Sequence, residues 1–100
     1  MTIYHLIKRG DWAKMKNSAM YHPNSLNKVG FIHCSTKEQV LPTANRRYAD
    51  QDMVVLEINA EKVPSKTVFE DLKSMGEEHP HIYGELPIDA VVRILELSDL

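Results

Sequence analysis

The sequence contains almost no cysteine, and its charges are nearly balanced. Cys34 is the single cysteine among 100 residues, so no intramolecular disulfide can form, which is typical of proteins in a reducing cytosol. The 12 lysines and arginines are offset by 14 acidic residues, and the net charge is −2. Because the basic residues are scattered, with no basic stripe, we expect no binding to a nucleic-acid backbone.

Long apolar runs are also missing. No segment approaches the about 20 apolar residues that a membrane-spanning helix needs, and we find no repeat or low-complexity tract. The composition, with 43% hydrophobic and 26% charged residues, is ordinary for a globular protein. We therefore expect a cytoplasmic protein with no membrane partner, folded as a single domain over residues 1–100. Nothing in the sequence indicates the oligomeric state.

Short β-type segments are spread along the chain in an order that does not alternate regularly with helices. A continuous apolar run at 53–58 predicts a central strand, because a strand buried on both faces needs no polar alternation. Further strands are predicted over residues 2–7, 30–34, 67–70, 81–83 and 90–97. About six strands and two helices in this order predict the α+β class.

Two stretches carry helical signatures. Apolar residues at helical spacing predict a helix over 11–20, and the turn-forming residues at 21–29 predict an irregular loop after it. A second helix is predicted over 36–48. Ser35 and Glu38 have the S-x-x-E spacing of a capping box, so we expect the Ser35 side chain to cap this helix.

Three histidines are the main candidates for catalytic residues. His5, His33 and His81 each stand in a short apolar strand-like segment, where an incidental imidazole is least expected. Imidazole readily acts as acid, base or hydrogen-bond partner near neutral pH. We predict that the three lie on neighbouring strands and line one cleft. For each one, a structural hydrogen bond to a backbone carbonyl is the alternative.

Four more residues are candidate ligand contacts. The helix that starts beside Ser35 offers free amides to an anion, and Arg46 can reach a phosphate or carboxylate, although a solvated surface arginine is the simpler alternative. Asn45 precedes Arg46 in the same helix. Tyr83 shares a strand face with His81. A small-molecule ligand is therefore the expected partner.

The sequence assigns no metal site. Residues 77–81 have metal-ligand side chains, but their spacing matches no strong zinc signature. The role of the carboxylates also stays open, because the residues do not decide whether Glu57, Glu70 or Glu85 is catalytic. Glu57 lies in the most apolar strand, where a carboxylate should be paired or functional unless the strand is at an edge.

Five motifs over nearly the whole chain resemble those of one bacterial family. They are Ile3-Tyr4-His5-Leu6-Ile7, Gly30-Phe31-Ile32-His33-Cys34-Ser35, Ala44-Asn45-Arg46, Phe69-Glu70-Asp71 and Pro80-His81-Ile82-Tyr83-Gly84 with the Leu86-Pro87 that follows. Together they resemble the uncharacterised domain of unknown function 952. That family is grouped by fold with the ADP-ribosyltransferases. The resemblance implies a split, bent, mainly antiparallel sheet with two helices around a nicotinamide-dinucleotide cleft, so NAD is the cofactor or ligand to test.

The resemblance to the transferases extends to some residues and not to others. Tyr4-His5 resembles the first-strand motif whose histidine holds the nicotinamide-side ribose. Where the transferases keep a tyrosine that stacks on nicotinamide, this chain has Ile32. Their catalytic glutamate has no secure counterpart, since Glu85 stands where the family commonly has proline. The resemblance therefore implies the fold more strongly than the activity.

Three functions follow as hypotheses. The first is an enzyme, or degenerate enzyme, that binds a nucleotide or ADP-ribose-type ligand, in which NAD-dependent ADP-ribosyl transfer is weak or absent. The second is a non-catalytic sensor that binds such a ligand without turning it over. The third and least favoured is a metal-dependent hydrolase built on the histidines. Binding without product separates the second hypothesis from the first, and metal analysis tests the third.

Overall fold

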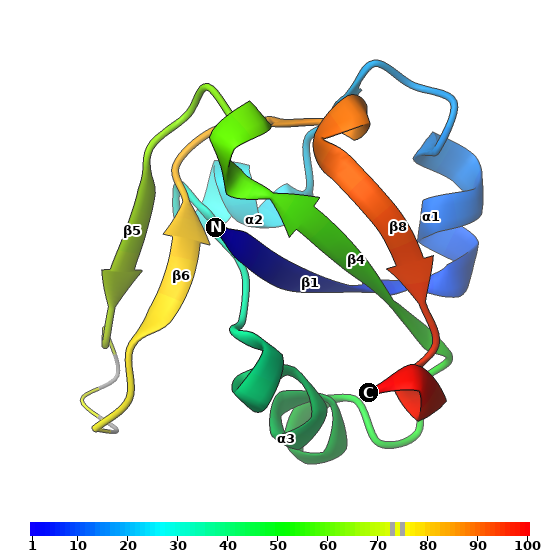
Figure 1. The fold of residues 1–100 in the computed structure, drawn as a ribbon, viewed down its shortest axis with the longest axis vertical. Coiled ribbons are helices and arrows are strands. Elements are labelled where there is room, and N and C mark those ends of the chain that lie inside the picture. Colours follow the sequence, from blue (N-terminus) through cyan, green and yellow to red (C-terminus); the bar gives the residue numbers. More distant parts are fainter. Residues whose placement is uncertain (73, 75) are drawn as a thin grey trace.

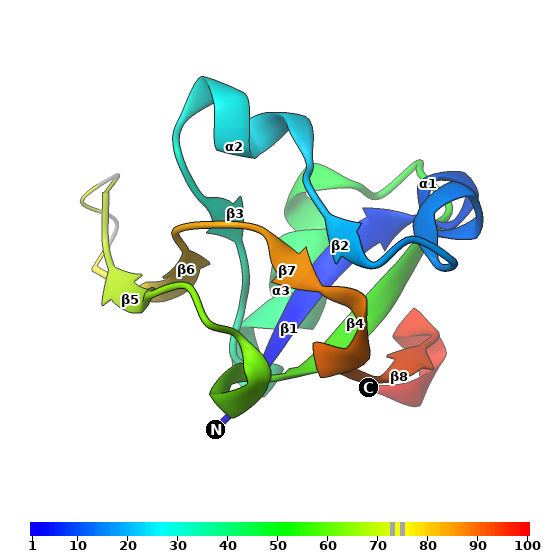
Figure 2. The same ribbon diagram turned by 90° about the horizontal axis from the view of Figure 1, so that it is seen from above.

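Three antiparallel sheets form the framework of the protein, and the α+β class is confirmed (Figure 1). The computed structural model describes residues 1–72, 74 and 76–100. One sheet has the order β1 (Thr2–Lys8), β4 (Met53–Asn59) and β8 (Val91–Leu95). A second sheet has the order β3 (Ile32–His33), β6 (His79–Ile82) and β5 (Thr67–Glu70). The third is the two-stranded pair β2 (Met20–Tyr21) and β7 (Leu86–Pro87), which lies between the other two sheets in Figure 2.

The described part of the chain contains three α-helices. They are α1 (Arg9–Met15), α2 (Asn24–Lys28) and α3 (Lys37–Arg47), with short 3₁₀ turns at Ala60–Lys62, Ile88–Ala90 and Leu97–Asp99. In Figure 1, α3 lies below the sheets and α1 lies beside β8. Among the described residues, no helix is long and apolar enough to cross a membrane.

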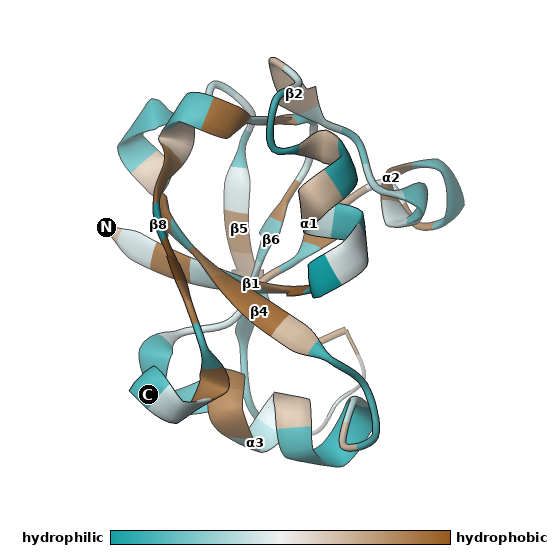
Figure 3. Cartoon of the chain, turned by 90° about the vertical axis from the view of Figure 1, so that its right-hand side faces the viewer, coloured by the Kyte–Doolittle hydropathy of each residue, from teal (hydrophilic) through white to brown (hydrophobic). Residues whose placement is uncertain are grey.

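The core forms around β4, whose position in the centre of its sheet was predicted from the apolar run. Met53 to Ile58 are buried throughout, and β4 pairs with β1 from Thr2↔Asn59 to Lys8↔Met53. Figure 3 shows β1 and β4 as the apolar centre of the molecule, with the more polar helices outside. Burial of apolar side chains such as these is the main favourable contribution to folding, at about 25 cal/mol per Å² of apolar surface.

The segment that follows β3 joins the two larger sheets. The amide of Cys34 donates a hydrogen bond to the Pro80 carbonyl at 3.0 Å, which continues the pairing of β3 with β6. One residue later, Ser35 exchanges both backbone hydrogen bonds with Tyr4 of β1, at 2.7 and 2.9 Å. The chain therefore changes sheets between Cys34 and Ser35, and the two larger sheets meet at this point.

Several predictions of local structure are wrong, including the count of about six strands and two helices, since the described residues form eight strands and three α-helices. The first helix spans Arg9–Met15 and not 11–20, because residues 20 and 21 are drawn into strand pairing with Leu86 and Pro87. The segment 21–29 is not an irregular loop but holds α2, which starts after Pro23. Gly30, with φ of 84°, follows this helix in the left-handed conformation that glycine adopts without strain.

The cap of α3 is Thr36 and not Ser35. The Ser35 backbone is extended and paired with Tyr4, so the helix begins one residue later than the S-x-x-E pattern predicted. Gln39 then occupies the third helical position, where its Oε1 accepts the Thr36 amide at 3.0 Å. The Gln39 Nε2 donates to the Glu78 carbonyl at 2.6 Å, which ties the start of α3 to the segment before β6.

We expect Gln39→Ala to lower the free energy of unfolding by about 1 kcal/mol, because it removes the hydrogen bond at the cap and the bond to Glu78. Urea denaturation of both proteins measures the difference. Gln51→Ala is the matched control, since Gln51 is exposed and uses only its backbone amide in a hydrogen bond to Tyr48. Equal stability losses in the two variants would contradict the assignment.

Candidate functional site

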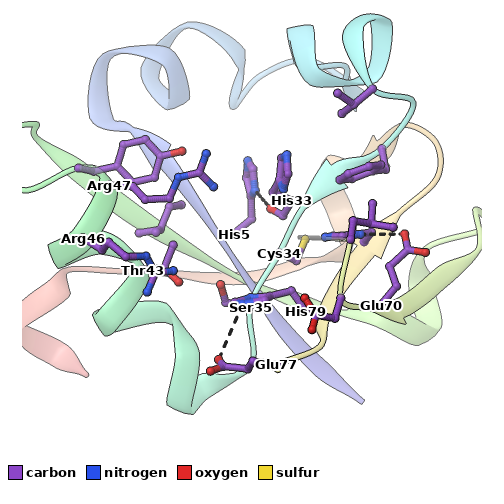
Figure 4. A pocket seen from close by; sticks show the side chains of 17 residues that line it. His5, His33, Cys34, Ser35, Thr43, Arg46, Arg47, Glu70, Glu77 and His79 are labelled. Atoms are coloured by element: carbon purple, nitrogen blue, oxygen red, sulfur yellow. Dashed lines mark hydrogen bonds and ion pairs between the residues drawn. The ribbon is translucent and has the colours of Figure 1, made fainter. Parts of the chain in front are cut away.

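A cavity of about 910 Å³ lies between α3 and the β3–β6–β5 sheet. Figure 4 shows Thr43 and Arg46 of α3 on one side, Glu70 and His79 on the other, and His5 and His33 between them. Its volume is within the range of small-molecule sites, roughly 300–1,000 Å³. The lining residues are His5, Leu6, Val29, Phe31, His33, Cys34, Ser35, Thr43, Arg46, Arg47, Tyr48, Glu70, Asp71, Leu72, Glu77, His79 and His81.

The three candidate histidines line this one cavity. His33 and His81 are direct partners in the β3–β6 ladder, and their ring centroids are 5.4 Å apart with the planes nearly perpendicular. His5 comes from β1 on the other side of the split. The structure thus brings together residues separated by up to 76 positions in sequence, as the strand patterns predicted. Their catalytic role stays a prediction.

His5 has both ring nitrogens occupied. Its Nδ1 lies 2.6 Å from the His33 carbonyl oxygen, and its Nε2 lies 3.0 Å from the Tyr21 hydroxyl. Because a carbonyl can only accept, Nδ1 carries the proton, and the neutral ring then accepts the Tyr21 proton at Nε2. Burial lowers the pKa of His5, partly offset by the bond to His33, and keeps the ring neutral.

His81 is paired with a carboxylate. Its Nδ1 lies 2.8 Å from Oε1 of Glu70, and the Tyr83 hydroxyl donates a short hydrogen bond to the same oxygen. Glu70 pairs with His79 in the β5–β6 ladder, so its side chain reaches His81 on the same sheet face, diagonally across the strands. The bonds from Tyr83 and His81 lower the pKa of Glu70, which holds it as an anion.

His81 has a second ring nitrogen, Nε2, that the contact with Glu70 does not use. The residue is 5% exposed and lines the cavity, and among the described residues Nε2 has no hydrogen-bond partner. No buried side-chain nitrogen or oxygen of the described residues lacks a partner, so Nε2 is not sealed in the core. With Nδ1 turned to Glu70, Nε2 is the atom that a ligand can reach.

Phe31 holds the two neighbouring histidines in place. Its ring stacks on His81 with centroids 4.1 Å apart and an interplanar angle of 18°, and it meets His33 edge-on at 4.7 Å. Phe31 itself is buried. Aromatic pairs at these distances contribute about 0.5–1.5 kcal/mol beyond the area that they bury. The apolar ring therefore restricts the orientation of both imidazoles.

The wall formed by α3 is basic. Thr43, Arg46 and Arg47 line the cavity, at the i, i+3 and i+4 spacing that puts residues on one helix face. Arg46 is exposed and makes no ion pair among the described residues. Asn45 was predicted as a ligand contact, but it does not line the cavity, because the same helical spacing turns it away.

The opposite wall is acidic. Glu70, Asp71 and Glu77 line it, and Glu77 also approaches His79 at 3.7 Å. Arginines on one wall and carboxylates on the other give the cavity a field directed from α3 toward the β5–β6 side. A ligand with an anionic end and a hydroxyl-bearing or cationic end fits such a field.

The other predicted site residues have structural places. Ser35 lines the cavity, but its backbone forms the bridge to Tyr4. Tyr83 does not line the cavity and instead holds Glu70. Glu57 is buried in the central strand β4. Its Oε2 accepts a hydrogen bond from Nε of Arg93 at 2.8 Å, so the pairing expected for a buried carboxylate is present. Glu85 bonds His22 outside the cavity.

The chemistry of Cys34 and of metals adds little to this site. Burial raises the pKa of the Cys34 thiol, so it stays protonated and unreactive at neutral pH. Among the described residues, no group of three histidine, cysteine or acidic side chains could hold a metal ion.

Sequence reasoning missed several residues of the cavity. Phe31 and Tyr48 line the cavity, and no local sequence pattern marks either of them as a contact. Arg47 was passed over as a surface residue beside Arg46. Glu70 was left undecided, although its place at the end of a strand with polar neighbours was the one available signal.

We expect the His5 ring to stay neutral well below pH 6.5, because burial lowers its pKa. The unfolded chain takes up a proton at about pH 6.5, so this residue's share of the stability is lost as pH falls below that value and is fully present above it. An NMR titration of the histidine Cε1–H signals measures this. His22 is the contrast, since Asn27 and Glu85 raise its pKa. A His5 midpoint at or above 6.5 would contradict the effect assigned to burial.

The comparisons with known proteins identify the family without naming an activity. No curated protein matches the chain. Two solved structures of protein CC0527 from Caulobacter crescentus, one of them a double mutant, share 27% of their residues with it, with TM-scores of 0.79 and 0.78. Each alignment covers 96% of this chain and 85% of the other. The model of a family described as "Protein of unknown function (DUF952)" matches residues 6–94. The chain therefore belongs to the DUF952 family.

Proposed function

We propose that this protein binds a nucleotide or ADP-ribose-type ligand in the cavity and acts on it as an enzyme or a degenerate enzyme. Arg46 and Arg47 would hold the phosphates. Ribose hydroxyls would reach the histidines and the carboxylate wall. An ADP-ribosyltransferase-like arrangement of the split sheet is part of this proposal, and its support is the motif resemblance together with the two sheets that meet at Ser35.

The opposed walls of the cavity carry the proposal. Arg46 has no carboxylate partner among the described residues, and it lies on the same helix face as Thr43 and Arg47. Arginine forms charge-assisted, often bidentate, hydrogen bonds to phosphate oxygens. The histidines lie between this wall and the acidic wall, where the sugar of a nucleotide would follow its phosphates. The reducing cytosol inferred from the single cysteine suits such a ligand.

A non-catalytic sensor is the second candidate, and the bonding of His5 favours it. With Nδ1 bonded to His33 and Nε2 bonded to Tyr21, this imidazole serves the fold and is not free to move a proton. A cavity in which the histidines only position a ligand would bind without turnover. The two candidates differ in whether product forms.

We expect NAD or ADP-ribose to bind with a dissociation constant in or below the millimolar range, and Arg46→Ala to weaken binding about ten- to hundredfold. A lost charge-assisted hydrogen bond costs about 1.5–3 kcal/mol, and each 1.4 kcal/mol is about tenfold in affinity. Isothermal titration calorimetry measures both constants. Lys62→Ala is the matched control, because it removes one positive charge at an exposed position that does not line the cavity. No heat with either ligand at several millimolar, or equal losses in the two variants, would refute the proposal.

We expect release of nicotinamide from NAD to be weak or absent. The carboxylate that faces the histidines, Glu70, already accepts hydrogen bonds from His81 and Tyr83, so less of its negative charge is available to an oxocarbenium-like ribose. Incubation with labelled NAD and chromatography of the products measures the rate. If the unaltered protein released nicotinamide rapidly and Glu85→Gln abolished the release, Glu85 would be catalytic and the prediction would be wrong.

A further inference from the structure

We propose that His81 is the general base of a phosphodiester-cleaving site in this cavity, with Glu70 and Tyr83 as positioning residues and His33 as the proton donor to the leaving group. This rests on the proposed function, since it assumes that the cavity takes a phosphate-bearing nucleotide. It adds the reaction, the class of phosphate and the role of each residue.

The position of His81 supports its role as the general base. A base needs one nitrogen without a proton that faces the ligand and a fixed ring. The Nδ1 of His81 points to Oε1 of Glu70, at 2.8 Å, and an ionised carboxylate only accepts, so the proton sits on Nδ1. Nε2 is then the basic nitrogen, and it is the one that reaches the cavity. Stacking on Phe31 keeps the ring in this plane.

Glu70 holds His81 through its Nδ1 nitrogen, and Tyr83 in turn holds Glu70. Oε1 of Glu70 accepts hydrogen bonds from both His81 and Tyr83, so the carboxylate cannot turn away without losing two bonds. A carboxylate behind an imidazole selects the tautomer and stabilises the imidazolium that forms during proton transfer. Tyr83 lies outside the cavity and therefore has no contact with substrate.

The charges of the cavity select the kind of phosphate. Arg46 and Arg47 attract an anion, whereas Glu70, Asp71 and Glu77 repel excess negative charge. A phosphodiester carries one negative charge, and a phosphomonoester carries nearly two at neutral pH. The mixed lining therefore favours a diester over a monoester. Diesters of nucleosides, including 2′,3′-cyclic nucleotides, belong to the class of ligand already proposed.

The reaction that follows is hydrolysis with two histidines. A water molecule gives a proton to Nε2 of His81 while its oxygen forms a bond to phosphorus. The bond between phosphorus and one ester oxygen breaks, and that oxygen takes a proton from the imidazolium of His33. A phosphomonoester and an alcohol leave. Solvent returns the proton from His81 to His33, and the Arg46 and Arg47 guanidiniums stabilise the charge on the phosphoryl oxygens.

His33 is suited to be the acid because of its place beside His81. The two residues are partners in the β3–β6 ladder, and ring centroids 5.4 Å apart allow both imidazoles to contact one phosphate group. Within residues 1–72, 74 and 76–100, the charged and titratable groups near the pair include Glu70, Tyr83 and, farther along the wall, Asp71 and His79. His5, bonded to the His33 carbonyl, fixes the backbone from the other side.

Two diesters with different leaving groups test these roles. Bis(4-nitrophenyl) phosphate releases 4-nitrophenolate, which needs no proton, whereas 2′,3′-cyclic AMP releases an alkoxide that does. We expect His81→Gln to lower kcat at least about a hundredfold with both probes, the range for general acid–base groups. We expect His33→Gln to lower kcat by a similar factor with cyclic AMP and by less than about threefold with the chromogenic diester.

The positioning residues are tested by the split between kcat and KM. Glu70→Gln should lower kcat about ten- to hundredfold and change KM by a much smaller factor, since its main effect is to remove the charge behind His81. Tyr83→Phe should have a smaller effect in the same direction. Glu85→Gln is the matched control, because Glu85 also bonds a histidine, His22, but lies outside the cavity. It should leave both constants unchanged.

A spectroscopic measurement keeps the test independent of activity and of the stability of the His81 variant. Nitrogen-15 NMR of the histidine rings should show the His81 proton on Nδ1, and titration with cyclic AMP should shift the Nε2 resonance. A proton on Nε2, no turnover of either diester, or equal effects of Glu70→Gln and Glu85→Gln would overturn the proposal. Binding of ADP-ribose without turnover would leave the proposed ligand class standing, whereas loss of both would remove the two proposals together.

Discussion

The hydrogen bond from His5 to the His33 carbonyl joins the two halves of the split sheet, and the site depends on it. It connects β1 to β3 beside the backbone bridge between Tyr4 and Ser35, because His5 follows Tyr4 directly in the sequence. Removing the His5 ring would leave the buried His33 carbonyl without this partner, which costs about 1–3 kcal/mol. Because α3 packs on β1 and His33 lies in β3, the same contact relates the basic wall to the histidines.

Two carboxylates show how burial and pairing lead to different roles. Glu57 lies in the core strand β4 and is held by Arg93 through two hydrogen bonds, at 2.8 and 3.3 Å, on the face of the sheet away from the histidines. A guanidinium stays charged at any ordinary pH, so that pair can only be structural. Glu70 is held by His81 and Tyr83, and imidazole can gain and lose a proton near neutral pH. Of the two pairs, only the second can therefore exchange a proton near neutral pH, which is the property that the proposed reaction uses.

The cavity brings together three elements that are stable for other reasons. α3 packs on β1 through its buried residues Val40 and Ala44, and the opposite side of its last turn is left to carry Arg46. The β5–β6 hairpin supplies the acidic wall, and β3 supplies a histidine between them. Among the described residues, Arg46 and Arg47 form no ion pair with the carboxylates of the opposite wall.

The sequence by itself determined the α+β class, the central place of β4 and the gathering of the histidines, because apolar runs and strand alternation are local properties. It did not determine that Thr36 caps α3, since the pairing of Ser35 with Tyr4 is a contact between distant segments. Nor could it place Glu70 behind His81 or turn Asn45 away from the cavity. Those depend on strand register and on the rotation of a packed helix, which only the tertiary structure sets.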